Sequence, residues 1–145
     1  YGNVYVARVA MGANDRQTLE AFREAESYPG PSMIIAYSHC IAHGYDMRDG
    51  LTQQKAAVDC GHWPLFRFDP RHVDDNANPM RLDCKEPSIP FKKYAYNETR
   101  YTMLAQSMPK EAERLLDLAQ QDADERWQYY ARMAAKRPRK QGEQK

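Results

Sequence analysis

Long apolar runs are missing from this sequence of 145 residues. No stretch approaches the roughly 18 consecutive apolar residues that a membrane span requires, and no signal-peptide pattern is present, so we expect no membrane association. An excess of one charge is also missing, because 21 basic residues face 20 acidic ones and the net charge is +1. This balance argues against nucleic-acid binding and against a basic face that docks on membranes.

Cysteine and glycine are both scarce. The three cysteines are an odd number and form no disulfide framework, so we expect a reducing compartment and a cytoplasmic protein. Gly2, Gly12 and Gly30 have no G-x-G partner, which excludes a glycine-rich phosphate loop. The Gly-Asp-Gly motif with a following Asn, which holds magnesium in thiamine diphosphate enzymes, is absent as well, since Asp49-Gly50 lacks the preceding glycine.

The composition that is present fits one soluble domain. Hydrophobic residues make up 42% of the chain and charged residues 28%, and the length suffices for one core. The chain opens on Tyr1, without an initiator Met, and enters a strand-like segment at once. We therefore expect a piece of a longer protein.

Strands and helices alternate in the first half of the chain. Asn14 is a predicted helix N-cap with Gln17 as its capping-box partner, and Leu19 and Phe22 follow at helical spacing. A second helix is predicted over residues 51–58. Apolar segments predict three strands, at Val4–Ala10, Ser32–Tyr37 and Leu65–Phe68. This alternation predicts an α/β fold, with three layers built around a parallel sheet.

The second half predicts other structure. Residues 72–96 are rich in Asp, Asn and Pro and predict an irregular surface arm. Residues 97–136 predict a helical region, in which an apolar stripe marks a long amphipathic helix over Lys110–Ala135. We expect this stripe to pack on the sheet or on a partner subunit. Residues 137–145 predict a basic, disordered tail.

One cysteine follows the most apolar strand. The segment SMIIAY delivers Ser38, His39 and Cys40 to the carboxyl edge of the predicted sheet, where ligands collect in such folds. A thiolate at Cys40 could ligate a metal cluster. The alternative is that Cys40 is a small buried hydrophobic residue.

A zinc site is a second alternative. Cys40 and His43 have C-x-x-H spacing, and Cys60 and His62 add a second pair, so four ligands are present for a tetrahedral site. However, the C-x-H spacing is tight for zinc, and Cys60 is expected at the far end of a helix from Cys40. Otherwise Cys60, His62 and Cys84 fit structural or surface roles.

The sequence also resembles a known family. The chain is similar, in order and spacing, to the C-terminal region of pyruvate:ferredoxin (flavodoxin) oxidoreductases in three segments: YGNVYVARVAMGA, EAESYPGPSMIIAYSHCIAHGYDM and WPLFRFDPR. Leu82-Asp83, the later Asn97-Glu98-Thr99-Arg100 and the long final helix continue the resemblance, which extends to about Lys136.

The resemblance implies an enzyme that oxidatively decarboxylates pyruvate on thiamine diphosphate and Mg²⁺. The acetyl group passes to coenzyme A, and electrons pass through 4Fe-4S clusters to ferredoxin or flavodoxin. Residues 1–71 are implied to be the second half of the thiamine diphosphate-binding α/β domain, and the enzyme a homodimer. In the family, the cluster nearest the thiamine has three cysteine ligands from an upstream segment and a fourth at an Ile-Ala-Tyr-x-x-Cys position. That position is Cys40, the one metal ligand implied here; no catalytic residue is expected in this segment.

Much of the family's enzyme is missing from this sequence, including the magnesium motif, the other three ligands and the domain with the two distal clusters. We therefore expect the isolated chain neither to decarboxylate pyruvate nor to bind thiamine diphosphate. Its main partner is expected to be the remainder of the oxidoreductase. Two other hypotheses stay open: a zinc-stabilised binding module, and a non-catalytic scaffold or interface domain.

Overall fold

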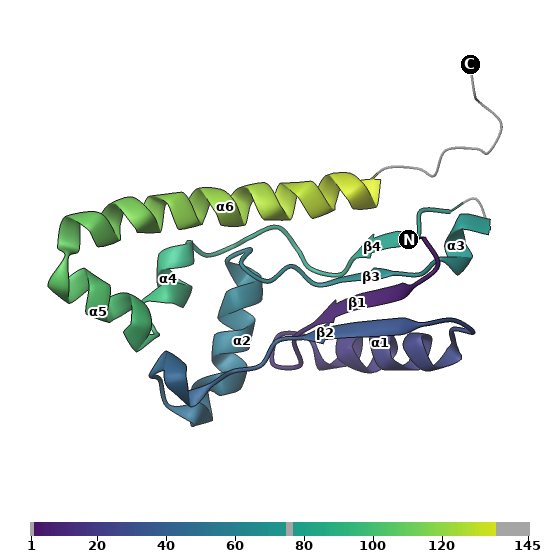
Figure 1. The fold of residues 1–145 in the computed structure, drawn as a ribbon, viewed down its shortest axis with the longest axis horizontal. Coiled ribbons are helices and arrows are strands. Elements are labelled where there is room, and N and C mark those ends of the chain that lie inside the picture. Colours follow the sequence, from purple (N-terminus) through teal and green to yellow (C-terminus); the bar gives the residue numbers. More distant parts are fainter. Residues whose placement is uncertain (1, 75–76, 136–145) are drawn as a thin grey trace, which may run out of the picture.

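The computed structural model describes residues 2–74 and 77–135, which fold into a sheet flanked by helices (Figure 1). The strands are β1 (Tyr5–Val9), β2 (Ser32–Ala36), β3 (Phe66–Phe68) and β4 (Met80–Leu82). The α-helices are α1 (Asp15–Ser27), α2 (Gly50–Asp59), α3 (Arg71–Asp74), α4 (Phe91–Ala95), α5 (Thr99–Ser107) and α6 (Pro109–Ala135). Two 3-10 turns, η1 (Ile41–His43) and η2 (Met47–Asp49), lie between β2 and α2.

The strands form one mixed sheet in the order β2-β1-β3-β4. β1 and β2 pair in parallel as predicted, with Tyr5 opposite Ser32 and Val9 opposite Ala36. β3 runs antiparallel to β1, and β4 runs antiparallel to β3. The α/β class is therefore confirmed, whereas the prediction that residues 65–68 form a third parallel strand is wrong.

The position of α2 accounts for the reversed strand. A parallel crossover needs a connection that returns along the sheet to its starting end. α2 instead stands beyond the end of the sheet and packs on α4 (Figure 1). Gly61 follows it in the left-handed conformation, with φ of 77°, and the Trp63 N–H donates to the Ala57 carbonyl. The chain consequently enters β3 from the end at which β2 leaves the sheet.

One face of the sheet is covered by α1. Tyr5, Ala7 and Val9 are buried and pack with Ala21 of α1, which is the alternation expected of a strand with one covered face. Leu19 and Phe22 do not share this contact, since they are 59% and 54% exposed. The buried residues of α1 are Gln17 and Ala21, and the helix predicted from the spacing of Leu19 and Phe22 is confirmed.

The predicted N-cap of α1 is confirmed in part. Asn14 Oδ1 accepts a hydrogen bond from the Gln17 N–H at 2.9 Å. The Gln17 side chain does not complete a capping box, because its amide donates to the Arg8 carbonyl and to Asp83. Gln17 thus ties the helix to β1 and to the segment after β4.

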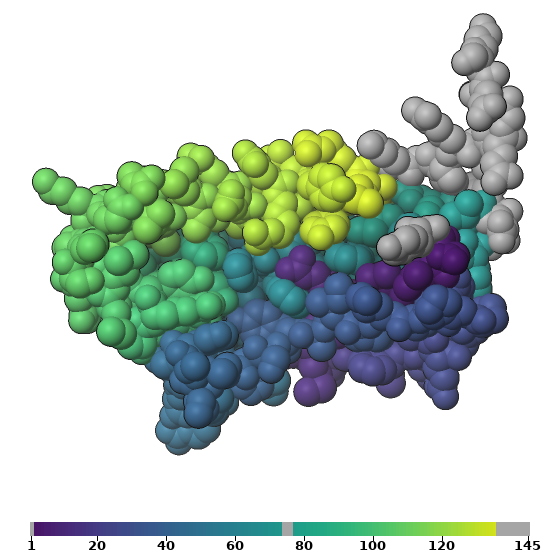
Figure 2. Space-filling model, viewed as in Figure 1, coloured from purple at the N-terminus to yellow at the C-terminus, as the bar shows by residue number. Residues whose placement is uncertain are grey.

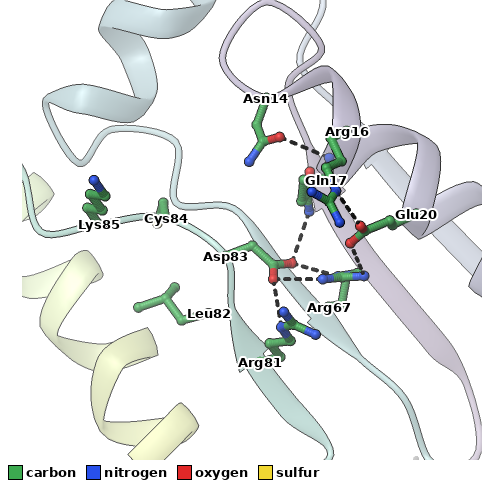
Figure 3. Close-up of a pocket in the computed structure, with 10 residues that line it drawn as sticks. All are labelled: Asn14, Arg16, Gln17, Glu20, Arg67, Arg81, Leu82, Asp83, Cys84 and Lys85. Atoms are coloured by element: carbon green, nitrogen blue, oxygen red, sulfur yellow. Dashed lines mark hydrogen bonds and ion pairs between the residues drawn. The ribbon is translucent and has the colours of Figure 1, made fainter.

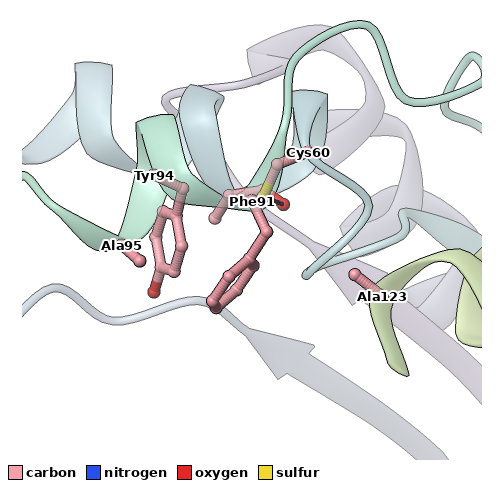
Figure 4. Close-up of a cluster of buried hydrophobic side chains, with 6 residues drawn as sticks. Cys60, Phe91, Tyr94, Ala95 and Ala123 are labelled. Atoms are coloured by element: carbon pink, nitrogen blue, oxygen red, sulfur yellow. Dashed lines mark hydrogen bonds between the residues drawn. The ribbon is translucent and has the colours of Figure 1, made fainter. Parts of the chain in front are cut away.

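The long final helix is confirmed, and it covers the opposite face of the sheet. Phe66 of β3 stacks on Tyr130 of α6 with ring centroids 4.9 Å apart. Toward its start, α6 packs on α4 and α5. A second core forms there from side chains of α4, α6 and the end of α2, among them Cys60, Phe91, Tyr94 and Ala123 (Figure 4). No helix in the described ranges is long and apolar enough to cross a membrane.

Residues 72–96 are more regular than predicted, because they contain β4 and α4. β4 joins the sheet where Met80, which is 5% exposed, pairs with Phe68. The apolar residues between the prolines thus give this segment enough apolar surface to bury for it to fold onto the sheet. The predicted basic tail, residues 137–145, lies outside the described residues.

β2 is more exposed than its apolar sequence predicts. A continuously apolar strand is typical of the interior of a parallel sheet, where both faces are covered. It lies at the edge of the sheet, and Met33 and Ile35 are 55% and 39% exposed. α6 packs on β4, at the other edge of the sheet, and β2 is uncovered in the view of Figure 2.

Candidate functional site

Cys40 lies in the turn that follows β2. Its backbone is extended, with φ of −142° and ψ of 139°, and it directly precedes η1. The residue is exposed, which a ligand to a cluster shared with another segment requires. Ser38 is exposed beside it and His39 is partly buried. The alternative that Cys40 is a buried hydrophobic residue is therefore wrong.

Gln54 of α2 holds the first part of this turn. Its side chain is buried, and its Nε2 lies 3.1 Å from His39 Nδ1. Its Oε1 accepts a hydrogen bond from the Gly12 N–H at 2.8 Å, which connects the loop after β1 to the same residue. The His39 ring rests on Gly50, where an added Cβ would come within 2.7 Å of the ring. These contacts fix the position of His39, the residue directly before Cys40.

Glu98, directly before α5, faces the second part of the turn. Its side chain is fully buried, and its carboxylate accepts hydrogen bonds from Gln53 Nε2 at 2.9 Å and from Arg100 Nε. His43 Nδ1 lies 3.8 Å from Glu98 Oε1. The two histidines that flank Cys40 thus turn toward α2 and α5, and the thiol between them is left free of both.

The four ligands of the zinc hypothesis do not come together. Cys60 is fully buried, its thiol donates to the Ala57 carbonyl at 3.4 Å, and burial raises its pKa to about 11. The His62 ring stacks on Tyr94, with centroids 5.0 Å apart, and also contacts Phe91. Within the described residues, no group of three or more His, Cys, Asp or Glu side chains could hold a metal ion. The zinc site is therefore not formed.

Cys84 also makes a contact inside the fold. Its sulfur accepts a hydrogen bond from the Leu65 N–H at 3.3 Å, and burial raises the pKa of its thiol. A thiolate is the form that binds metals, and a raised pKa disfavours the thiolate at Cys60 and Cys84. The exposed Cys40 is therefore the better candidate for a metal ligand.

A polar groove of about 440 Å³ was not predicted from the sequence (Figure 3). Its floor is Arg67 of β3, which is 4% exposed and forms two hydrogen bonds with Asp83, at 2.7 and 2.9 Å. Arg67 also pairs with Glu24 at 2.8 Å and with Glu20 at 3.2 Å. The one signal in the sequence is an arginine inside the apolar run WPLFRF. Each arginine of the groove is paired with a carboxylate, so we interpret the groove as a structural ion-pair cluster.

Burial of His62 makes stability depend on pH. Burial lowers the pKa of His62 from 6.5 to about 4, with the Arg126 charge acting in the same direction. Above about pH 7 the imidazole is neutral in both states and has no effect. As the pH falls from about 6.5 to 4, the unfolded chain binds the proton first, so stability decreases by about 2 kcal/mol.

Urea unfolding at pH 7.5 and 4.5 checks this prediction. In His62→Gln the difference in unfolding free energy between the two pH values should be smaller by about 2 kcal/mol than in the wild type. An equal pH dependence in both proteins would show that His62 does not carry the effect.

Comparison with known proteins identifies relatives over nearly the whole chain. It is 51% identical over 134 residues to a putative pyruvate-flavodoxin oxidoreductase of Synechocystis sp.. It is 45% identical over 134 residues to a pyruvate:ferredoxin oxidoreductase of Moorella thermoacetica, and 43% identical over 136 residues to a probable pyruvate-flavodoxin oxidoreductase of Escherichia coli. The matches cover 92–94% of this chain but only 11–12% of these relatives. No family model matches the chain.

Proposed function

The chain is homologous to one segment of the pyruvate-flavodoxin oxidoreductases, and from this relationship we propose that it is part of such an enzyme. The proposed reaction converts pyruvate and coenzyme A to acetyl-CoA and CO₂ and delivers electrons through 4Fe-4S clusters to ferredoxin or flavodoxin. The proposed role of this segment is to supply one ligand, Cys40, to the cluster nearest the thiamine diphosphate. The observation that carries the role is the exposed thiol at the end of β2.

The residues present fit one corner of a 4Fe-4S cluster. Such a cluster takes four cysteine thiolates, and Cys40 is the exposed cysteine of this chain, while Cys60 and Cys84 make internal contacts. Three further ligands would come from another segment of the enzyme. When bound, the cluster supplies one-electron transfer. The protein's part is to present the sulfur: His39 and His43 turn away to α2 and α5, so that Cys40 is the side chain left for the cluster.

The residues present do not fit thiamine diphosphate and Mg²⁺. The sequence lacks the Gly-Asp-Gly loop, and the described residues contain no cluster of acidic side chains able to hold a cation. We assign that site to the rest of the enzyme and derive no step from it. Residues 1–71 are proposed to complete the same domain.

The open edge of β2 supports the remainder of the enzyme as the main partner. The Tyr37 N–H donates to the Val9 carbonyl, and alternation along the strand then points the backbone groups of Ile34 and Ala36 to the open edge. Met33 and Ile35 are exposed beside them. An apolar edge with unpaired backbone groups is a template for a further strand. A homodimer and a cytoplasmic location complete the proposal, the latter because all three cysteines are free thiols.

The full-length protein, purified without oxygen, tests the proposed reaction. We expect iron and sulfide to be bound, and flavodoxin or ferredoxin to be reduced only when pyruvate and coenzyme A are both present. The isolated chain of 145 residues is the control and should show no such activity. Zinc in place of iron, or electron transfer independent of pyruvate, would contradict the proposal.

A further inference from the structure

The start of α5 contacts the turn that carries Cys40. The two segments are far apart in the sequence, since Thr99 lies 55 residues after Gly44. The Thr99 hydroxyl donates a hydrogen bond to the Gly44 carbonyl. One residue earlier, the carboxylate of Glu98 faces His43. Glu98, the N-cap of α5, and Thr99, its first residue, therefore contact two consecutive residues of the turn.

The contact at Gly44 is close. Gly44 has φ of 75°, in the left-handed region that favours glycine, and an added Cβ would lie 2.4 Å from the Thr99 Cβ. The backbone of the turn therefore rests directly on the Thr99 side chain. Cys40 belongs to the same unit, because the His43 N–H donates to the Cys40 carbonyl and the Gly44 N–H donates to the Ile41 carbonyl. A shift at Gly44 is thus passed to Cys40 through these backbone hydrogen bonds.

The contact at His43 involves a buried charge. Glu98 is fully buried, and a buried carboxylate is costly unless it is paired and hydrogen-bonded. Gln53 and Arg100 satisfy part of this need. His43 Nδ1, itself buried and without a hydrogen-bond partner in the described structure, lies 3.8 Å from the carboxylate. The Nδ1 atom of His43 therefore faces the Glu98 carboxylate.

From these contacts we infer that Glu98 and Thr99 are positioning residues for Cys40, which set where its sulfur meets the cluster. This inference rests on the proposed function. A ligand that is shared between segments must be held to within about half an ångström by groups behind it. Cys40 follows an edge strand and is exposed, so its own strand gives it little support. The contacts of Glu98 with His43 and of Thr99 with Gly44 supply this support.

Three variants of the full-length protein test the inference. Thr99→Val removes the hydroxyl and keeps the shape, Thr99→Ser restores the hydroxyl, and Thr102→Val is the matched control. Thr102 is on the same helix, and its hydroxyl donates to the Thr99 carbonyl and not to the turn. The measurements are amide hydrogen exchange at Gly44, iron content, and the EPR line shape and reduction potential of the cluster nearest the thiamine.

In Thr99→Val the Gly44 N–H keeps its bond to the Ile41 carbonyl, but the turn loses the bond at the Gly44 carbonyl and opens more often. We therefore expect the Gly44 amide to exchange about fivefold faster, since one hydrogen bond contributes about 1 kcal/mol to closure of the turn. We also expect a changed line shape and potential for that cluster alone. Thr99→Ser and Thr102→Val should match the wild type. Glu98→Gln should act in the same direction as Thr99→Val.

Cys40→Ala, measured in parallel, separates the two proposals. If Cys40→Ala leaves every cluster signal unchanged, the proposed ligand role fails. If Cys40→Ala removes a cluster signal but Thr99→Val leaves both that signal and Gly44 exchange at wild-type values, the positioning role fails and the ligand role stands.

Discussion

Replacing Cys40 with alanine in the full-length protein is expected to remove one cluster and leave the fold intact. Iron content should fall by about four atoms per chain, because a 4Fe-4S cluster that lacks one of its four thiolates is incomplete. The EPR signals of the two distal clusters implied by the family resemblance should remain. Pyruvate-dependent reduction of flavodoxin should be lost with the cluster that is nearest the thiamine.

The fold should tolerate this change for a simple reason. Cys40 is exposed and lies in a turn, so truncation to alanine leaves no internal cavity, and the stability should change by less than about 0.5 kcal/mol. Cys84→Ala is the matched control, since its thiol contacts the Leu65 backbone inside the chain. That variant should keep all of its iron. Wild-type iron and unchanged EPR signals in Cys40→Ala would exclude the ligand role.

Replacing Arg67 with methionine is expected to lower the free energy of unfolding by about 3–5 kcal/mol. Arg67 is 4% exposed, and methionine would fill similar space without a charge. Asp83, whose side chain is 6% exposed, would then lose the two hydrogen bonds that pair it with Arg67. Asp83 keeps its contacts with Gln17 and Arg81. The expected loss therefore comes from weaker pairing of Asp83, together with the loss of the Arg67 partner at Glu20 and Glu24.

Chemical unfolding of the 145-residue chain in urea measures this effect. Arg16→Met is the matched control, because Arg16 is 85% exposed and its ion pair with Glu20 is on the surface. That variant should change stability by less than about 1 kcal/mol. The double variant Arg67→Met/Asp83→Leu should recover part of the loss, since it removes the buried carboxylate that pairs most closely with Arg67. A loss below about 1 kcal/mol in Arg67→Met would show that the cluster is not structural.

Local sequence patterns predicted several elements correctly. The cap at Asn14, the parallel pair β1 and β2 and the long helix α6 all depend on neighbours in sequence or on hydrophobic period. These features need only short-range information, so the sequence suffices for them.

Strand direction and the side-chain network around the turn could not be predicted in this way. β3 has the composition of a buried strand in either direction, and its antiparallel pairing depends on where α2 stands. Likewise, Glu98 and Thr99 contain no local signal that they meet His43 and Gly44.

By itself, the sequence carried the resemblance to the pyruvate:ferredoxin (flavodoxin) oxidoreductases, the α/β class and the candidate ligand Cys40. The tertiary structure alone decided the direction of β3, the burial of Arg67 and the contact of α5 with the turn that carries Cys40. The physical reason is the range of the interactions. Capping and periodicity act over a few residues, whereas pairing of a buried charge depends on which distant segments close over it.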